Sequence, residues 1–330
     1  MDRVRIVFIG AGGIAQRHLG CLEQFADVDI VGFADRDMAQ ASGTAARYGA
    51  SAHANHCELL DRAAPDAVYV CVPPFAHGAI EHDIIARRLP FFVEKPLSTD
   101  LATARSIAAK ADEAGLVTAV GYHWRYLDTV QEARELLAET PAQLVCGHWL
   151  DATPPSQWWW QQSLSGGQIV EQATHLLDLA RYLVGPVVAV AGFAGHGRRG
   201  AFAGLDVATA SSASLRFASG AVGNLVSTCM LRWTHQVSLQ LFADGLAIEL
   251  TDHDIMVDRG QGRPVRRAEA DPVWLQDRAF IDAVKGDASG IRCTYGDALA
   301  THCLALSVAK ALKSGDLVEV PSDAREVAGV

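Results

Sequence analysis

Two groups of polar residues in this chain have the types and spacing that acid–base chemistry requires. Glu94-Lys95-Pro96 directly follows a short apolar run, and Glu171, His175 and Asp178 lie far downstream. A lysine ammonium can donate a hydrogen bond to a reacting oxygen, and a histidine can accept a proton near neutral pH. Such a pair could help to remove a hydride and a proton from an alcohol. The remaining sequence must then supply the elements that position these residues.

A glycine-rich turn near the start of the chain indicates a dinucleotide site. Residues 4–9 form a short apolar run typical of a buried strand, and the sequence GAGGIA follows at residues 10–15, before a helical stretch. In a G-x-G-x-x-A turn of this kind, the first glycine makes the turn and the second admits the pyrophosphate, which faces the helix N-terminus. The cofactor-binding residues predicted here are Gly10, Gly12, Gly13 and Ile14.

The end of the next strand indicates which dinucleotide binds. Asp35 follows the apolar residues 30–34 at the distance expected of a carboxylate that accepts both hydroxyls of the adenine ribose. Such a carboxylate repels a 2′-phosphate, whereas the neighbouring Arg36 could bind one. We predict NAD, with NADP as the alternative, and an ordinary strand-end acid remains the other interpretation of Asp35.

Two further apolar runs end at residues that could face the same cofactor. Residues 67–72 end at Pro73, and residues 91–93 end at Glu94 and Lys95. In an open parallel sheet, ligands lie outside the carboxyl ends of the strands, so one cleft could collect all of these strand ends. We therefore assign residues 1–122 to an N-terminal Rossmann domain with a doubly wound parallel sheet.

The second part of the chain, residues 123–330, has a different pattern. Short β-like runs follow one another with turn signals between several of them, which indicates hairpins and a mostly antiparallel sheet. We expect an α+β domain here, so the fold class of the whole chain is α/β with this second domain. The expected strands are residues 144–150, 187–191, 210–217, 223–228, 237–242 and 246–250, and residues 263–267 are expected to form a solvated turn.

One helix, over residues 168–184, should carry the second polar group. At 100° per residue, Glu171, His175, Asp178 and Tyr182 fall on one stripe, and the apolar residues fall on the opposite face, which can pack on the sheet. Either Glu171 or Asp178 could hydrogen-bond the imidazole of His175. The alternative for His175 is a buried structural histidine.

Together these residues resemble the Gfo/Idh/MocA family, which includes glucose–fructose oxidoreductase and inositol 2-dehydrogenase. The resemblance implies a large open sheet in the second domain whose free face commonly forms the interface of a homodimer or homotetramer. The motifs that carry it are residues 10–15, Val72-Pro73-Pro74 with His77, Glu94-Lys95-Pro96, residues 121–126 (GYHWRY) and Glu171 to Asp178.

The same resemblance implies roles for individual residues. Lys95 would reach the reacting oxygen beside the nicotinamide, with a cis Lys95–Pro96 bond, and His175 would transfer the proton. Relatives often have Asp-x-x-x-His where this chain has Glu171 and His175, so Glu171 would either bind a substrate hydroxyl or orient His175. His77 would lie near the cofactor.

Three further residues are expected in the substrate pocket. His123 and Arg125 would line it, although Arg125 could instead form an ion pair across the domains. Trp158 begins a run of three tryptophans, residues 158–160. Aromatic rings stack on sugars and are also enriched at protein interfaces, and both interpretations remain open for this run.

The composition excludes several classes of function. The net charge of −10 argues against non-specific nucleic-acid binding. The seven cysteines form no CxxC pair, and the histidines belong to no partnered cluster, so we predict no metal site. No apolar run approaches a membrane span, and scattered cysteines favour a reducing compartment, which predicts a cytoplasmic protein.

The leading hypothesis is an NAD(P)-dependent oxidoreductase that transfers a hydride between nicotinamide and a sugar, polyol or related carbonyl compound. Two alternatives remain open. One is an NAD-dependent enzyme that cleaves glycosides by transient oxidation with the same Lys95 and His175. The other is a non-catalytic regulator that binds NAD(P).

Overall fold

The chain forms two compact units in the computed structural model, which describes residues 3–198 and 200–322. Unit 1 comprises the residues up to 98 together with 102–126 and 271–298, and unit 2 comprises 99–101, 127–270 and the residues from 299 onward. The domain boundary after residue 122 stays a prediction. The units differ from it in three places: residues 123–126 and 271–298, expected in the second domain, belong to unit 1, and residues 99–101 belong to unit 2.

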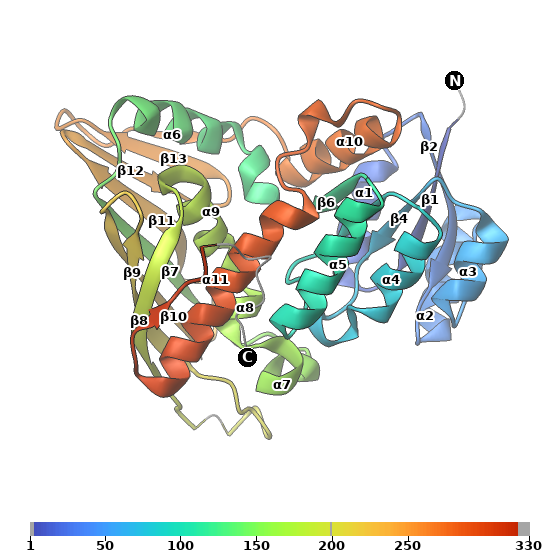
Figure 1. Cartoon of the computed structure of the whole chain (residues 1–330), viewed down its shortest axis with the longest axis horizontal. Helices are drawn as coiled ribbons and strands as arrows, with labels where there is room; N and C mark the ends of the chain where they lie inside the picture. Colours follow the sequence, from blue (N-terminus) through green and yellow to red (C-terminus); the bar gives the residue numbers. More distant parts are fainter. Residues whose placement is uncertain (1–2, 199, 323–330) are drawn as a thin grey trace. The chain divides into compact units, whose positions relative to one another are not determined.

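Unit 1 is built on a six-stranded sheet in the order β3-β2-β1-β4-β5-β6 (Figure 1). Every neighbouring pair is parallel, which confirms the Rossmann prediction; the short strand β3 was not predicted. The strands are β1 (Val4–Ile9), β2 (Val28–Ala34), β3 (Ser51–His53), β4 (Ala67–Val70), β5 (Phe91–Val93) and β6 (Thr118–Val120).

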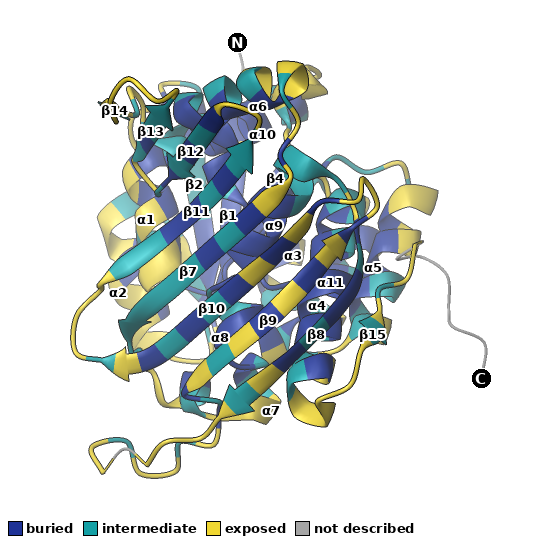
Figure 2. Ribbon diagram, turned by 90° about the vertical axis from the view of Figure 1, so that its left-hand side faces the viewer, coloured by how far each residue is buried: buried dark blue, intermediate teal, exposed yellow. Residues whose placement is uncertain are grey.

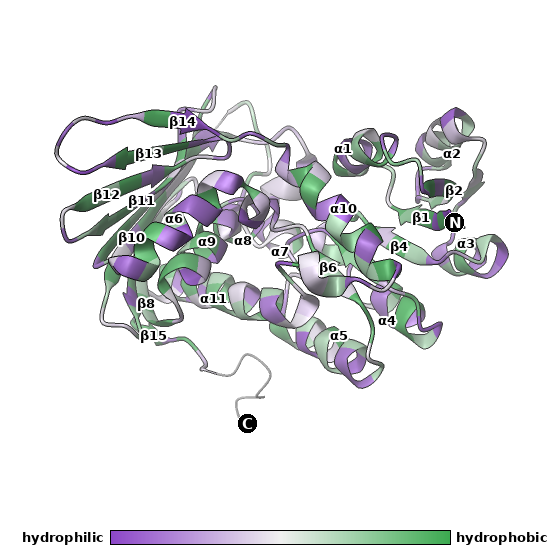
Figure 3. Ribbon diagram, turned by 90° about the horizontal axis from the view of Figure 1, so that it is seen from above, coloured by the Kyte–Doolittle hydropathy of each residue, from purple (hydrophilic) through white to green (hydrophobic). Residues whose placement is uncertain are grey.

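Helices with one apolar side pack on this sheet, and α5 carries hydrophobic and hydrophilic residues side by side (Figure 3). The core includes stacked rings of Phe8, Tyr69 and Phe92 on neighbouring strands, and Phe280 joins them from a helix distant in sequence. The helices are α1 (Gly13–Leu22), α2 (Met38–Tyr48), α3 (His56–Ala63), α4 (Ala79–Ala86), α5 (Leu101–Glu113, in unit 1 from its second residue) and α10 (Pro272–Val284), with the 3-10 turns η1 (Pro74–Ala76), η2 (His123–Tyr126) and η4 (Ala288–Gly290).

Unit 2 contains a nine-stranded sheet in the order β14-β13-β12-β11-β7-β10-β9-β8-β15. All neighbours are antiparallel except β7 and β10, so the predicted mostly antiparallel open sheet is confirmed. The strands are β7 (Leu144–Ala152), β8 (Val187–Gly195), β9 (Ala210–Phe217), β10 (Val222–Leu231), β11 (Gln236–Ala243), β12 (Leu246–Leu250), β13 (Asp254–Asp258), β14 (Val265–Arg267) and β15 (Val318–Glu319).

One expectation for this region was wrong. Residues 263–267 were predicted to form a solvated turn, but Val265–Arg267 is the edge strand β14. Arg266 forms ion pairs with Glu132, at 2.5 Å, and with Asp128. A short run rich in arginine has little strand propensity of its own, and these ion pairs hold it beside β13.

Burial alternates along the strands of unit 2, because successive side chains point to opposite faces (Figure 2). The inner face packs against helices, whereas the outer face exposes apolar side chains such as Phe193 and Val222, which are 75% and 52% exposed. The helices are α6 (Asp128–Glu139), α7 (Gln162–Ser165), α8 (Gln168–Glu171), α9 (Thr174–Val184) and α11 (Tyr295–Ser314, in unit 2 from Leu299), with the 3-10 turn η3 (Gln157–Trp160).

Among the residues that the structure describes, no helix combines the length and apolarity needed to cross a membrane.

Candidate functional site

The glycine turn after β1 has the geometry of a close backbone approach. Gly10 has φ +92°, and a Cβ atom there would lie 2.2 Å from the carbonyl oxygen of Cys71, so only glycine fits. The carboxylate of Asp35, at the end of β2, accepts hydrogen bonds from the N–H groups of Ala11 and Asp37, both at 2.9 Å. Asp35 is therefore fixed beside the turn, as the fingerprint requires.

The first turn of α1 leaves backbone donors available. The bond from the N–H of Gln16 to the carbonyl of Gly12, at 3.1 Å, opens the helix, so the N–H groups of Gly13, Ile14 and Ala15 have no partner within the helix. A Cβ atom on Gly13 would meet nothing within 4 Å. Open space beside free donors at a helix N-terminus fits a pyrophosphate.

Arg36, the residue that could favour NADP, is exposed next to Asp35. Because an exposed arginine side chain can adopt many rotamers, its position does not select a cofactor. The choice of NAD over NADP depends on Asp35, whose carboxylate is held in place by two backbone donors.

His77 follows Pro73 and η1, and its side chain is enclosed. Its Nδ1 atom lies 2.6 Å from a carboxylate oxygen of Glu81, whose other oxygen accepts a bond from the N–H of Gly78 at 2.6 Å. Burial opposes ionisation of Glu81, but His77 and the Gly78 N–H outweigh it and lower the pKa of Glu81. The Nε2 atom of His77 is buried without a hydrogen-bond partner among the described residues, which fits a polar ligand group at this place.

Lys95 lies on the turn that follows β5. The Lys95–Pro96 peptide bond is cis, as predicted, and Lys95 is half-buried between the buried residues Glu94 and Pro96. The N–H of Glu94 donates to the carbonyl of Val70 at 2.9 Å, which ties the turn to β4. The lysine thus begins at the carboxyl edge of the parallel sheet, the same edge as the glycine turn and Asp35.

Sequence reasoning missed two residues next to this turn, His18 of α1 and Asp277 of α10. The imidazole of His18 lies 3.1 Å from the carboxylate of Glu94 and 2.8 Å from that of Asp277. The sequence did contain an indication that His18 is buried, because this residue falls on the apolar face of α1. Nothing in the sequence connects Asp277 with it, since 259 positions separate them.

The segment η2 carries His123 and Arg125, which were predicted to bind substrate. Enclosure of the ring is the main cause that lowers the pKa of His123 to about 4, and Lys95 adds to it against the effect of Glu94. Arg125 is buried; its guanidinium pairs with Asp297 and donates to the carbonyl of Arg292 at 2.8 Å. The ion pair considered for Arg125 therefore exists, within unit 1 rather than across domains, and its substrate role stays a prediction.

In unit 2, the single helix predicted over residues 168–184 is wrong. The structure has α8 and α9, which end and begin on either side of Gln172 and Ala173. The N–H of Ala173 donates to the carbonyl of Gln168, five residues back, so the α-helical pattern is interrupted between Glu171 and His175. Buried side chains cover α9 on all sides from residue 174 to 180, so no exposed polar stripe forms.

His175 is 5% exposed, near the start of α9. Its ring stacks on the indole of Trp149 of β7, with centroids 6.1 Å apart and planes 15° apart. Asp178, one turn later, accepts a hydrogen bond from the hydroxyl of Thr301 at 2.7 Å. The indole of Trp149 thus covers one face of the His175 ring, and the predicted hydrogen bond between this ring and a carboxylate stays a prediction.

Glu171 is held by the tryptophan run. Its carboxylate accepts a hydrogen bond from Nε1 of Trp159 at 2.7 Å. Trp159 is 1% exposed and packs with Val207 and Cys229, so this tryptophan is part of the core and neither stacks on a sugar nor lies at an interface. Trp158 is only partly buried at the edge of that cluster, and its predicted contact with substrate stays a prediction.

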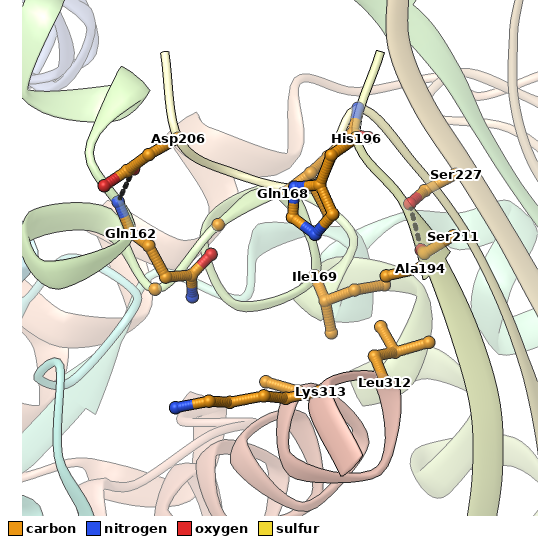
Figure 4. A pocket seen from close by; sticks show the side chains of 14 residues that line it. Gln162, Gln168, Ile169, Ala194, His196, Asp206, Ser211, Ser227, Leu312 and Lys313 are labelled. Carbon is orange, nitrogen blue, oxygen red and sulfur yellow. Dashed lines mark hydrogen bonds between the residues drawn. The ribbon is translucent and has the colours of Figure 1, made fainter. Parts of the chain in front are cut away.

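A pocket of about 510 Å³ lies within unit 2 (Figure 4). Its lining includes Gln168 and Ile169 of α8, His196 after β8 and Lys313 of α11. None of the predicted catalytic or substrate-binding residues of unit 2 lines it. The pocket is therefore a separate feature from the region around His175.

One group of possible metal ligands contradicts the expectation that the histidines join no such cluster. The imidazole of His56 lies 2.9 Å from the carboxylate of Asp83, and the Cys57 thiol lies 3.3 Å from it. The guanidinium of Arg87 donates to the carbonyl of Asp83 and to the carboxylate of Asp61, at 2.9 and 2.8 Å. A fixed positive charge beside the group disfavours a cation.

Comparison with known proteins agrees with both units. Residues 4–122 match an oxidoreductase family with an NAD-binding Rossmann fold, and residues 130–248 match a GFO/IDH/MocA C-terminal domain. An uncharacterised protein of Schizosaccharomyces pombe is 26% identical over 301 residues, which cover 80% of this chain and 74% of that protein. The D-glucoside 3-dehydrogenase of Escherichia coli (strain K12) is 30% identical over 198 residues, 55% of this chain and 54% of that protein.

A solved structure of levoglucosan dehydrogenase in complex with NADH and levoglucosan shares the fold. It is 18% identical, has a TM-score of 0.86, and the match covers 97% of this chain and 100% of that chain. The predictions of an oxidoreductase and of NAD as cofactor are confirmed by the matched family.

Proposed function

The chain belongs to the Gfo/Idh/MocA family of oxidoreductases, and on that premise we propose that it is an NAD-dependent dehydrogenase acting on a secondary hydroxyl of a pyranose sugar or glycoside. The observation that carries this proposal is the position of Lys95. It follows β5 at the sheet edge where the glycine turn and Asp35 also lie. A cationic donor at that edge can reach an oxygen that reacts beside a bound dinucleotide.

Two residues do the acid–base work in this proposal. Lys95 donates a hydrogen bond to the reacting oxygen and stabilises the negative charge that develops there. His175 takes the hydroxyl proton during oxidation and returns it during reduction. Bound NAD supplies the acceptor for the hydride. Positioned acid–base groups of this kind contribute about 100- to 10,000-fold to the rate.

The remaining predicted residues bind and orient. Glu171, held by Trp159, and the partly buried Trp158 contact the sugar. His123 is neutral at pH 7, because its pKa is lowered to about 4, so its ring can accept or donate a hydrogen bond to a hydroxyl. Arg125, which lies on the same segment η2, also binds the substrate in this proposal.

The choice of NAD over NADP follows from Asp35. Its carboxylate is fixed between two backbone N–H groups and is half-buried. Each of its oxygens keeps a lone pair that can accept from a ribose hydroxyl, and a 2′-phosphate would meet a like charge.

The substrate class is drawn from relatives. The similar Escherichia coli protein is named a D-glucoside 3-dehydrogenase, and the similar solved structure is a levoglucosan dehydrogenase with levoglucosan bound. Both names denote oxidation of a pyranose compound. We therefore place the reaction of this chain at a ring hydroxyl, with reduction of the matching ketone as the reverse direction.

Binding and turnover measurements test the proposal. NADH and NADPH are titrated by nicotinamide fluorescence, and NAD⁺ reduction is followed with methyl glucosides, levoglucosan, D-glucose and myo-inositol. Lys95→Met should bind NADH within about threefold of the original protein and lose turnover by about 100- to 10,000-fold. The matched control is Lys110→Met, an exposed lysine on α5, which should keep full turnover.

Each outcome of this test has a meaning. Turnover by Lys95→Met at the original rate would contradict the assignment. Tight NADH binding with release of the aglycone from a glycoside, and no net NADH, would favour glycoside cleavage by transient oxidation. NADH binding without any turnover would favour a non-catalytic regulator.

We also propose a homodimer or homotetramer that forms through the outer face of the sheet in unit 2. Apolar side chains from three strands are exposed on that face: Leu144, Phe193 and Val222 are 39%, 75% and 52% exposed. Exposed apolar patches of this kind mark interaction surfaces. Sedimentation of the protein and of Phe193→Glu tests the interface.

We also propose a cytoplasmic location. The seven cysteines are all free thiols, which agrees with a reducing compartment.

A further inference from the structure

A fully buried histidine lies beneath the turn that carries Lys95. His18 of α1 is 0% exposed, Asp277 of α10 is 0% exposed and Glu94 is 5% exposed. Charged groups are rarely buried unless they are paired, because their removal from water is costly. Three such groups in one buried cluster must therefore satisfy one another.

The geometry around His18 fits a protonated ring. Its Nδ1 atom lies 2.8 and 3.0 Å from the two carboxylate oxygens of Asp277, and its Nε2 atom lies 3.1 Å from a carboxylate oxygen of Glu94. Both ring nitrogens thus contact carboxylates. The imidazolium can donate from both nitrogens, which matches this arrangement, and burial raises the pKa of Asp277. Burial alone would lower the pKa of His18, but Asp277 and Glu94 outweigh it and raise that pKa to about 10.

Aromatic rings keep the imidazolium in place. Phe92 meets the ring of His18 edge-on with centroids 4.9 Å apart, and Tyr69 lies at 5.4 Å. Phe280 of α10 packs edge-on against Tyr69 at 5.4 Å. The imidazolium of His18 therefore has one orientation, and that orientation points Nε2 at Glu94.

The Glu94 carboxylate is confined from its other side as well. A Cβ atom on Gly121 would lie 2.3 Å from its Oε1 atom, so the carboxylate sits directly against that glycine. The backbone of Glu94 is bound to Val70 at 2.9 Å, and the N–H of Gly121 donates to the carbonyl of Val93 at 3.0 Å. Glu94 is thus held at its backbone by the sheet and at its carboxylate by His18. The next residue along the chain is Lys95.

We propose that His18, held by Asp277, is a positioning residue: its imidazolium fixes the Glu94 carboxylate and thereby the turn that presents Lys95. This inference rests on the proposed role of Lys95. His18 touches neither substrate nor cofactor in this role and acts through Glu94. A displacement of about 1 Å at a reacting group can cost about 100-fold in rate. Loss of the contact between His18 and Glu94 should therefore reduce kcat while cofactor binding persists.

The test compares two substitutions of buried histidines that contact carboxylates. His18→Gln removes the charge and one of the two contacts. His53→Gln is the matched control: His53 is 7% exposed, lies 3.7 Å from the Glu58 carboxylate, and belongs to β3, at the far edge of the sheet from β5. His18→Gln should lower kcat about 10- to 100-fold with NADH affinity within threefold, and His53→Gln should leave kcat unchanged.

A second readout needs no substrate. The chain has five lysines, so reductive methylation with ¹³C-formaldehyde gives a simple NMR spectrum in which Lys95→Arg identifies the Lys95 signal. In His18→Gln the Lys95 signal should move or broaden while the other four stay. Asp277→Asn should give a smaller change of the same kind, and it serves as the test if His18→Gln does not fold.

Several results would overturn the inference. An unchanged Lys95 signal in folded His18→Gln or Asp277→Asn would do so, as would a kcat within twofold of the original protein. A fall in NADH affinity as large as the fall in kcat would indicate a purely structural role. Lys95→Met distinguishes failure of the proposed function from failure of the role of His18. If Lys95→Met keeps turnover, the proposed function fails. If Lys95→Met is inactive while His18→Gln is fully active, only the role of His18 fails.

Discussion

Two of the predicted catalytic residues, Lys95 and His175, lie beside groups of different kinds. In unit 1, the turn that carries Lys95 is braced by buried charges, with His18 between the carboxylates of Glu94 and Asp277. In unit 2, His175 lies against the indole of Trp149. Charge pairs depend on protonation and weaken when one partner titrates, whereas ring stacking depends on shape and contact area. The two regions should therefore respond to different perturbations.

Within unit 2, the largest effect on kcat is expected from removing the aromatic contact of His175, and it should be smaller than that of His18→Gln. Trp149→Leu should lower kcat about 3- to 10-fold, because an aromatic pair contributes about 0.5–1.5 kcal/mol beyond its buried area. Trp149→Phe keeps a ring in place and should stay close to the original protein. Steady-state kinetics at several pH values measure both. Equal rates in all three proteins would show that the stacking contact does not orient His175.

A change of pH should act on the buried charges around His18 in unit 1. The pKa of His18 rises to about 10 in the folded protein from about 6.5, so its contribution to stability is full below pH 6.5 and is lost as the pH rises toward 10. The titratable groups around it are Asp277, Glu94, Tyr69 and His123; burial keeps the pKa of Tyr69 well above its ordinary value of 10 and raises the pKa of Asp277.

Urea unfolding at pH 6.5, 8 and 9.5 measures this contribution as the difference in stability between the original protein and His18→Gln. That difference should shrink as the pH rises. Trp160→Phe serves as the comparison, since it removes a donor to the uncharged carbonyl of Pro154 and its difference from the original protein should not depend on pH. A constant difference for His18→Gln would show that the ring is neutral in the folded state.

The smallest effect on kcat is expected in the tryptophan run of unit 2. Trp159→Phe keeps a ring in the core but removes the donor to the Glu171 carboxylate, and it should cost about 1–3 kcal/mol of stability with less than a threefold change in kcat. Trp160→Phe removes a donor to the uncharged carbonyl of Pro154 and should cost less. Thermal unfolding compares the two. A larger loss in Trp160→Phe would contradict the importance of the Glu171 contact.

Local patterns predicted the elements that carry most of the candidate site. The glycine turn and Asp35 were expected from residues close together in sequence, the cis Lys95–Pro96 bond was expected from the family resemblance, and each has the expected local geometry. The helix around His175 was only partly predicted. The helical periodicity of the apolar residues predicts one helix over residues 168–184. It does not predict the interruption at Gln172 and Ala173, which the hydrogen bonds of the structure show.

Short apolar runs, the glycine turn after the first of them and the turn signals between the later ones determined that this chain has a parallel sheet followed by a mostly antiparallel one, because closely spaced runs joined by turns form hairpins. The sequence also determined the dinucleotide fingerprint, because a turn that approaches phosphates requires glycine at specific positions. Only the tertiary structure decided which distant residues meet. It brings Asp277 to His18 and Glu94, stacks Trp149 on His175 and buries Trp159 in the core of unit 2. Such contacts depend on how helices pack on the sheets, and packing joins positions that no local pattern relates.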